Sequence, residues 1–279
     1  MKNLLRTLVF DGQISLTVAD TTAIVQEGAT RHNFSKPSAY VYGKAISAMT
    51  FMSACLKSDV GEISLSLKSD GECGSIGVSG NRNLYMRGYI ENTQAVGDES
   101  ACLGTNGALT IVRDDGYNRP FVGSCAISEK GVDASFEEYY AVSEQLPTRI
   151  YTTVEFDQTG KVAFAGVAVL QALPFADESA QTGMQTALLD NLLAAVKEQG
   201  VERAVERVFG KSDEVWETRE AVYQCNCSRE RLLGVLVTLG ERQVRQIIQE
   251  DGKINAHCHY CNTDYIFTEE DANGLFSGV

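Results

Sequence analysis

Two short strings near the C-terminus constrain the fold of this chain more than any other feature of its sequence. The stretch "CNCSRER" begins at Cys225, and the stretch "CHYC" begins at Cys258. They hold four of the chain's eight cysteines, as one Cys-x-Cys pair and one Cys-x-x-Cys pair. In a reducing compartment, thiols spaced in this way are typical of a metal or redox centre rather than of a disulfide framework.

A zinc ion fits this set of thiols. Zinc prefers four tetrahedral ligands, with thiolate sulfurs at about 2.3 Å, and four thiolates leave no position open for a substrate. Such a site contributes on the order of 10–16 kcal/mol of apparent binding energy, which is comparable to the whole stability of a domain. His257 and His259 flank the second pair, and either could replace a thiol as a ligand. We favour an all-cysteine site, because four thiols already complete the shell: Cys225, Cys227, Cys258 and Cys261.

The hydrophobic patterns predict an α+β protein in three parts. Residues 1–174 alternate strand-like and helix-like runs and predict a mainly antiparallel sheet domain with helices. Residues 175–221 predict a helical linker without a core of its own, which must lie on a neighbouring domain or melt easily. Residues 222–279 predict a small zinc-binding domain of two helices, a strand–knuckle–strand and a final helix, with Ser228 as a helix cap.

Individual segments carry these predictions. Period-2 runs predict a strand in "EISLSLKS", and hairpins around Asp115–Gly116 and near Gly160. A helical stripe after Pro37 predicts a long helix, and "ASFEEYYAVSEQ" predicts a shorter one. The glycine-rich "DGECGSIGVSGN" opens no helix and is interpreted as turns between strands.

Composition narrows the classes of partner. The net charge of −13 argues against nucleic-acid binding, for which we also find no large Lys/Arg cluster. No stretch is long and apolar enough to span a bilayer, and "MKNLLRTLVFDGQ" reaches Asp11 too soon for a signal peptide. We therefore expect a cytoplasmic protein that binds neither nucleic acid nor membrane.

The remaining four cysteines are scattered singly through the first half of the chain. We interpret them as small buried hydrophobic residues, which is the usual role of an isolated cysteine: Cys55, Cys73, Cys102 and Cys125.

The paired thiols leave two roles open. In one, zinc is a permanent clip with no further function. In the other, it is a switch, because metal-bound thiolates are the form that oxidants attack, and a Cys-x-Cys disulfide closes a tight, labile ring. Oxidation of either pair would then remove ligands, release the ion and unfold the C-terminal part, and the weakly anchored middle helices could come loose with it.

At this point the chain resembles the 33 kDa chaperonin family, a family of redox-regulated heat-shock holdases. "YQCNCSRER" and "CHYCNTDYIF" are similar to the zinc signature of that family, with Tyr265 and Phe267 behind the second pair. "MRGYIEN", "YYAVSEQLPT" and "LQALP" extend the resemblance over nearly the whole chain, although Val167 stands where the family usually has the second glycine of a pair.

The resemblance implies a chaperone rather than an enzyme. It implies a reduced, zinc-bound, inactive form in the cytoplasm, and activation by Cys225–Cys227 and Cys258–Cys261 disulfides with release of zinc. The active form would hold unfolding client proteins without ATP and associate as a homodimer.

Two other classes compete with this interpretation. A zinc-ribbon nucleic-acid binder would suit the thiol pairs but not the acidic charge. A thiol oxidoreductase would use "CHYC" as its redox motif, but such motifs usually begin a helix after a strand, and here a strand-like run follows.

Overall fold

The structure is a computed structural model that describes residues 2–210 and 216–276. The chain forms two compact units, Met1–Gln224 and Cys225–Val279, which are called unit 1 and unit 2 below. Both combine helices with antiparallel strands, so the predicted α+β class is confirmed. The described residues include no helix with the length and apolar character needed to cross a bilayer.

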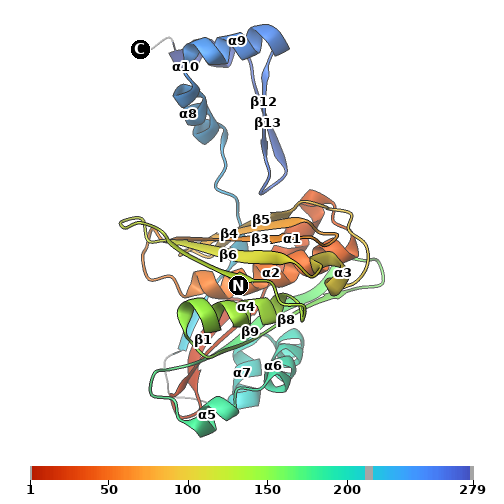
Figure 1. Cartoon of the computed structure of the whole chain (residues 1–279), viewed down its shortest axis with the longest axis vertical. Helices are drawn as coiled ribbons and strands as arrows, with labels where there is room; N and C mark the ends of the chain where they lie inside the picture. The colour runs from red at the N-terminus through yellow and green to blue at the C-terminus, as the bar shows by residue number, and fades with distance from the viewer. Residues whose placement is uncertain (1, 211–215, 277–279) are drawn as a thin grey trace. The chain divides into compact units, whose positions relative to one another are not determined.

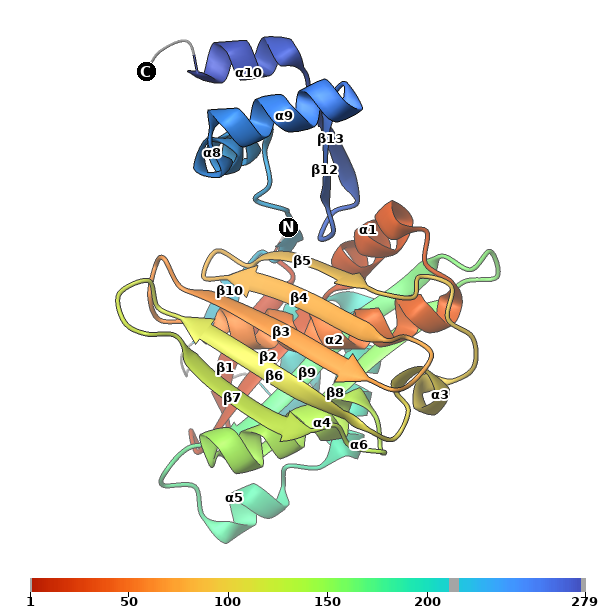
Figure 2. The ribbon, with the colours of Figure 1, turned by 45° about the horizontal axis from the view of Figure 1, so that its top comes forward.

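Unit 1 contains two sheets. The five-stranded sheet has the order β10-β1-β2-β9-β8 and the six-stranded sheet has the order β11-β5-β4-β3-β6-β7 (Figures 1 and 2). The strands of the first are β1 (Leu4–Val9), β2 (Ile14–Asp20), β8 (Thr148–Phe156), β9 (Val162–Ala172) and β10 (Trp216–Arg219). Those of the second are β3 (Glu62–Ser69), β4 (Ser75–Asn81), β5 (Tyr85–Ile90), β6 (Gly107–Asp114), β7 (Phe121–Ala126) and β11 (Val222–Tyr223).

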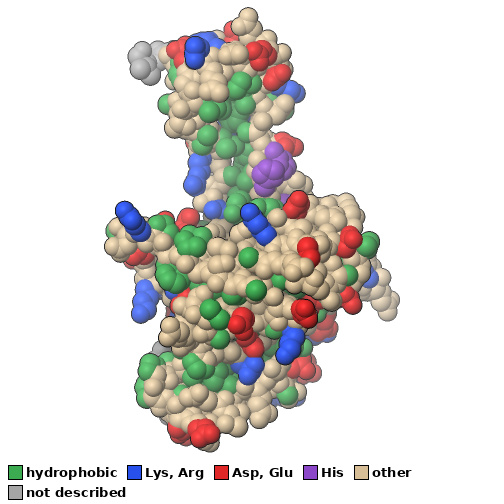
Figure 3. All heavy atoms as spheres, viewed as in Figure 1, with side chains coloured by type: hydrophobic (Ala, Val, Ile, Leu, Met, Phe, Trp, Pro, Cys, Tyr) green, Lys and Arg blue, Asp and Glu red, His purple; other side chains and the backbone are tan. Residues whose placement is uncertain are grey.

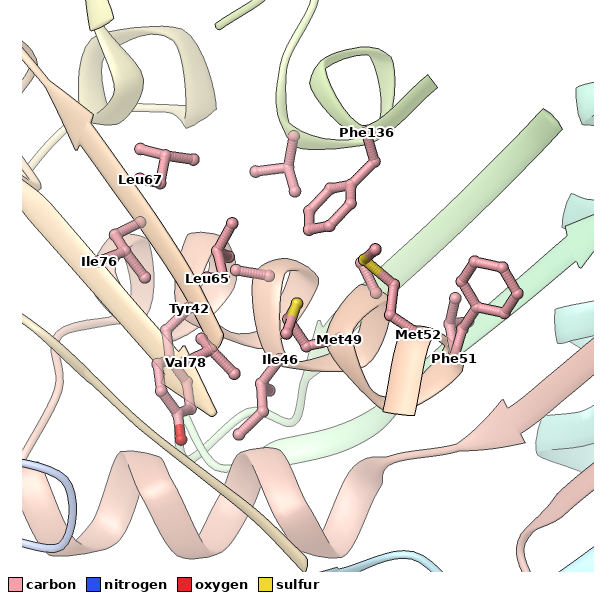
Figure 4. Packing of buried hydrophobic residues seen from close by; sticks show 14 of the residues in the cluster. Tyr42, Ile46, Met49, Phe51, Met52, Leu65, Leu67, Ile76, Val78 and Phe136 are labelled. Atoms are coloured by element: carbon pink, nitrogen blue, oxygen red, sulfur yellow. The ribbon is translucent and has the colours of Figure 1, made fainter. Parts of the chain in front are cut away.

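A central helix fills the space between the sheets. This helix, α2 (Lys36–Ala54), contacts strands of both sheets, and almost all of its side chains are buried. The Ser35 hydroxyl accepts the N–H of Ser38 as its cap, and Pro37 lies in the first turn, as predicted. Figure 4 shows Met49 of α2 in the same buried cluster as Leu65 and Leu67 of β3. The helices that complete this core are α1 (Thr22–His32), α3 (Glu99–Leu103), α4 (Val132–Tyr139) and the π-helical turn Tyr140–Glu144.

The segments with regular periodicity follow the predictions. The strand at β3 buries Ile63, Leu65 and Leu67 on one face. The two predicted hairpins are the antiparallel pairs β6–β7 and β8–β9. Alternation of apolar and polar residues was sufficient for β3, which has one face against the core. β9 is buried on both faces, and its hairpin was indicated by the turn near Gly160.

The interpretation of "DGECGSIGVSGN" as turns is wrong from Ser75 onward. Those residues form β4, which pairs with β3 and β5 inside the six-stranded sheet. A Cβ on Gly77 would lie 2.4 Å from Cε1 of Tyr89 on the neighbouring strand. A Cβ on Gly80 would lie 2.1 Å from Oγ of Ser53 on α2. These glycines thus permit close packing against a ring and a helix rather than a change of chain direction.

The middle segment lies on unit 1. Its helices are α5 (Glu178–Thr182), α6 (Thr186–Gln199) and α7 (Val201–Phe209). The predicted apolar stripe buries Leu189, Leu192 and Leu193 against the outer face of the five-stranded sheet. Of the two possibilities raised by the sequence, the structure therefore shows helices that lie on a neighbouring core.

The prediction of a purely helical linker over residues 175–221 missed the strand β10, and the prediction for residues 222–279 missed the strand β11. Residues 216–219 and 222–223 form β10 and β11, which join one edge of each sheet. Lys211–Val215 of the predicted linker lie outside the described residues. The division into independently folding parts 1–174, 175–221 and 222–279 stays a prediction.

Unit 2 has the order that the sequence predicts. It consists of α8 (Arg229–Leu239), α9 (Glu241–Asp251), β12 (Ile254–Cys258), β13 (Thr263–Phe267) and α10 (Glu269–Phe276). Ser228 caps α8 by accepting the N–H of Arg231. One small apolar cluster lies beneath the helices: Leu236, Val244, Ile248, Ile254, Phe267 and Ala272.

Candidate metal centre

The second cysteine pair lies in the tight connection between β12 and β13. Cys258 ends β12, and its carbonyl oxygen accepts the N–H groups of Cys261 at 3.3 Å and Asn262 at 2.8 Å. Asn262 has φ = 55°, a left-handed conformation that asparagine tolerates better than most residues. The predicted strand–knuckle–strand is therefore confirmed. The motif starts no helix, so the setting expected for a thiol oxidoreductase is not the one found.

The first pair lies between β11 and α8. Cys225 and Cys227 lie in an extended segment that ends where Ser228 caps α8. The cap fixes the start of the helix directly after Cys227, so the direction of this segment is set by a local hydrogen bond rather than by apolar packing.

The structure brings all four cysteine sulfurs together. Every Sγ atom of the set lies within 4.8 Å of every other. The Sγ atoms of Cys225 and Cys258 are 3.7 Å apart, and those of Cys227 and Cys261 are 3.2 Å apart. Both of these contacts join a sulfur of one motif to a sulfur of the other, so the cluster ties the extended segment to the hairpin.

This geometry fits a tetrahedral thiolate site. Sulfurs bound to one zinc ion at about 2.3 Å lie about 3.8 Å from one another. The two separations between the motifs, 3.7 Å and 3.2 Å, lie just below that value, and no separation exceeds 4.8 Å. All four thiols are free, and each is half-buried or buried, which limits access of water to a bound ion. A metal ion is thus compatible with the donor set, its spacing and its burial.

Two hydroxyl groups surround the sulfurs. The Oη of Tyr265 lies 3.2 Å from Sγ of Cys227, and Oγ1 of Thr263 lies 3.3 Å from Sγ of Cys261. Burial opposes ionisation of Cys227, but hydrogen bonds with Tyr265 and the neighbouring thiols lower its pKa to about 7. Burial raises the pKa of Cys225 and of Cys261. Of these three thiols, Cys227 is therefore the one that its surroundings favour as a thiolate.

The two histidines beside the second pair do not join the cluster. Nδ1 of His257 lies 2.7 Å from Oδ1 of Asp264, across the hairpin. The rings of His257 and His259 meet edge to face with centroids 5.1 Å apart. The arrangement favours the four-cysteine set over the alternative in which imidazole replaces a thiol.

Sequence reasoning missed Arg229 as an organising residue of unit 2. Its guanidinium donates to the carbonyl oxygen of Ile266 at 2.8 Å and to Oδ1 of Asp271 at 2.6 Å, and it lies over the ring of Phe267. It thereby connects the start of α8 with β13 and α10. Its partners lie about forty positions away in the chain, so no local spacing indicates them.

The other four cysteines belong to unit 1. Cys73 and Cys102 are fully buried, as predicted, whereas Cys55 and Cys125 are only partly buried against the core. Burial raises the pKa of all four thiols, which keeps them protonated and poorly reactive.

The charged side chains give no sign of a nucleic-acid surface on the face that Figure 3 shows. Lys and Arg side chains are scattered there singly among acidic groups.

Comparison with known proteins points to one family. The family model of the Hsp33 protein matches residues 2–268. A 33 kDa chaperonin of Bacillus licheniformis is 29% identical over 286 residues, and one of Bacillus cereus strain AH187 is 31% identical over 288 residues. In both cases 99% of each chain is covered.

A solved structure has the same fold. The crystal structure of the 33 kDa chaperonin (heat shock protein 33 homolog) of Thermotoga maritima aligns with a TM-score of 0.78 at 23% identity. The alignment covers 99% of this chain and 98% of the other.

Proposed function

Because this chain belongs to the Hsp33 family, a family of chaperones, we propose that it is a redox-regulated holdase that needs no ATP. In the reduced protein, one Zn²⁺ held by Cys225, Cys227, Cys258 and Cys261 keeps unit 2 folded and the chaperone inactive. The observation that carries the proposal is the meeting of these four sulfurs from two distant motifs, within 4.8 Å of one another.

Oxidation changes what the cysteines can bind. The four thiolate sulfurs give up four electrons as Cys225–Cys227 and Cys258–Cys261 bonds form. If hydrogen peroxide is the oxidant, two molecules of peroxide accept the four electrons and four protons and become four molecules of water. Disulfide sulfurs are poor ligands, so the ion, which supplies the cross-link while it is bound, is released.

The position of the thiols explains why unit 2 would then unfold. Disulfides within each motif replace the contacts between motifs, at 3.7 Å and 3.2 Å, that tie the extended segment to the hairpin. The remaining apolar cluster is small, and a unit of this size rarely stays folded on its core alone. Unfolding would reach the segment that precedes Cys225, and the oxidised chains would associate as homodimers in the cytoplasm.

The test is an aggregation assay. Reduced, zinc-loaded protein should leave the aggregation of heat-treated citrate synthase unchanged, and protein treated with peroxide at mild heat should suppress it without ATP. Zinc release and loss of four free thiols should follow the same time course. A Cys125→Ser variant, which leaves the cluster intact, should respond like the wild type, whereas a variant with Ser at all four cluster positions should not respond to peroxide.

Equal suppression by reduced and oxidised protein would refute the switch while leaving the chaperone. Absence of suppression in both forms would refute the chaperone function itself.

A further inference from the structure

The two shortest strands of unit 1 complete one edge of each sheet. β10 pairs antiparallel with β1, from Leu4 opposite Arg219 to Thr7 opposite Trp216. β11 pairs parallel with β5, with Val222 opposite Tyr85. Both strands come from the eight residues that precede Gln224, and Cys225 follows directly. One short segment beside the candidate metal centre therefore closes two sheet edges.

Backbone bonds, one asparagine and a few apolar contacts hold this segment. Trp216 packs against the cluster beneath α6 and α7, and Ala221 and Tyr223 pack against the cluster around α2. The N–H of Asn3 donates to the carbonyl oxygen of Arg219 at 3.1 Å. The side-chain amide of Asn3 donates to the carbonyl oxygen of Ala221 at 2.9 Å and accepts the N–H of Ala221 at 2.8 Å. The four residues of β10 are only half-buried, whereas Leu4 and Leu5 beneath them are fully buried. The strand β10 is thus more exposed to solvent than the strand that it covers.

Arginine side chains outnumber the acidic side chains that they meet where β1 pairs with β10, a junction that is called the seam below. Glu217 lies 3.9 Å from the guanidinium groups of both Arg6 and Arg219. Arg219 in turn donates to the carbonyl oxygen of Arg82. The Nε atoms of Arg6 and Arg82 and one Nη of Arg219 are buried with no hydrogen-bond partner among the described residues. Such groups weaken the seam, and they leave this edge suited to an incoming carboxylate.

The opposite edge of the five-stranded sheet is closed differently. There the carboxylates of α4 cover β8: Glu137 accepts the N–H of Ile150 at 3.1 Å, and Asp133 accepts the N–H of Thr152 at 3.2 Å. Both acceptors belong to the core of unit 1. Release of the segment 216–223 would therefore open the edges of β1 and β5 and leave the β8 edge closed.

We propose that the edges of β1 and β5 are docking sites for extended segments of unfolded client proteins, and that β10 and β11 occupy these sites in the resting chain. An exposed edge offers unpaired N–H and C=O groups that bind any extended peptide, which suits a chaperone with many clients. The residues seated on β1 indicate the preferred chemistry, an aromatic residue followed by an acidic one, as in Trp216–Glu217. This inference rests on the proposed function, because oxidation at Cys225 and Cys227 is what frees the segment.

Hydrogen exchange on the full-length protein tests the proposal. Oxidation should speed exchange in residues 216–224 and in part of β1 and β5, and addition of reduced, carboxymethylated α-lactalbumin should restore protection in β1 and β5. If the oxidised protein suppresses aggregation while β1 and β5 exchange as before, or if the client protects only the other outer strand β7, this inference is wrong and the proposed function stands. If the oxidised protein fails to suppress aggregation, both fall.

A peptide provides a second arm. The peptide WETREAVY, which corresponds to Trp216–Tyr223, should compete with the client for oxidised protein, and WKTREAVY should compete several-fold less well. Equal competition by both peptides, or by neither, would contradict the assigned chemistry.

A variant tests the anchor. Asn3→Ala removes the two side-chain bonds to Ala221, together with a bond from Nδ2 to the carbonyl oxygen of Asp20, and should raise the exchange of β1 and β5 in the reduced protein roughly tenfold. Asn118→Ala removes a comparable bond, from Nδ2 to Asp115 in the β6–β7 turn, and should leave both edges unchanged. Equal exchange at the edges in the two variants would overturn the role of Asn3.

Discussion

The two units of this chain reach stability by different means. Unit 1 buries two extended apolar clusters, one between its sheets around α2 and one beneath α6 and α7. Unit 2 buries one small cluster, and four cysteine sulfurs meet between its first segment and its hairpin, where we propose a metal cross-link. Dispersed packing can be lost only by unfolding the whole core, whereas a cross-link of four atoms can be removed by one chemical event. The contrast explains how one unit could respond to an oxidant while the other persists.

Of the changes that test this difference between the units, removal of the proposed metal should have the largest effect. Chelation at neutral pH should withdraw stabilisation on the order of 10 kcal/mol from unit 2 and leave unit 1 folded. Amide protection of β12, β13 and α9 should disappear while that of α2 stays. The double variant with Cys227→Ser and Cys261→Ser should show the same pattern without a chelator. If β12 and β13 stayed protected in metal-free protein, unit 2 would not depend on the metal for its stability, and the proposed difference between the units would be wrong.

Lys44 is a buried cation of unit 1, and its removal should destabilise that unit. Nζ of Lys44 lies 2.9 Å from Oε2 of Glu99 and 3.3 Å from Oδ2 of Asp133, and its side chain is only 8% exposed. Lys44→Met leaves two partly buried carboxylates without their cation and should lower the free energy of unfolding of unit 1 by about 3 kcal/mol. The zinc content should not change.

An exposed ion pair in the same unit is the control for Lys44. Nζ of Lys197 lies 2.6 Å from Glu155, but both side chains are nearly half exposed. Lys197→Met should cost less than about 1 kcal/mol by urea denaturation. If the two variants lose equal stability, burial is not the reason that Lys44 matters.

The sequence predicted those parts of the molecule whose pattern is local. The alternation in β3, the stripe in α6 and the two cysteine pairs each carry their signal within a short window. The cap at Ser228 was also found in this way, because its acceptor and donor are three residues apart.

The parts that could not be predicted depend on distant partners. β4 was not predicted, because its glycines are needed only for close packing against Tyr89 and Ser53, which are distant in the sequence. β10 lies in a charged stretch, and its strand conformation comes from pairing with β1, more than two hundred residues earlier. The same holds for the contacts of Arg229 with Ile266 and Asp271.

Two serine caps allow the same substitution to be compared in both units. The hydroxyl of Ser35 accepts the N–H of Ser38 and donates to the carbonyl oxygen of Ala95 at 2.8 Å, whereas that of Ser228 accepts the N–H of Arg231. Each Ser→Ala change should cost about 1–2 kcal/mol, with the larger loss at Ser35 because it breaks two bonds.

The two substitutions are expected to destabilise different units, and this distinguishes their effects. Ser228→Ala should lower the chelator concentration at which unit 2 unfolds, and Ser35→Ala should lower the urea midpoint of unit 1. A shift of the chelator midpoint by Ser35→Ala would show that the two stabilities are coupled.

The smallest expected effect concerns the pH dependence of unit 1. Burial raises the pKa of Asp133 above its ordinary value of 3.8, although Lys44 and hydrogen bonds from Thr152 oppose the shift. A raised folded-state pKa stabilises the fold below pH 3.8, and this contribution is lost as the pH rises through the folded value. Asp133→Asn removes the titration, so its stability relative to the wild type should improve as the pH rises from about 4 to 7.

An exposed carboxylate should show the opposite sign. Hydrogen bonds from Thr159 and the N–H of Lys161 lower the pKa of Asp157, so this group stabilises the fold above pH 3.8 and loses its contribution as the pH falls through the folded value. Asp157→Asn should therefore become less favourable, relative to the wild type, as the pH rises. Urea denaturation with chelator present keeps unit 2 unfolded throughout, so circular dichroism then reports unit 1 alone. Parallel pH trends for the two variants would mean that burial does not control the titration of Asp133. Buried charge would then not contribute to the stability of unit 1 beside apolar packing.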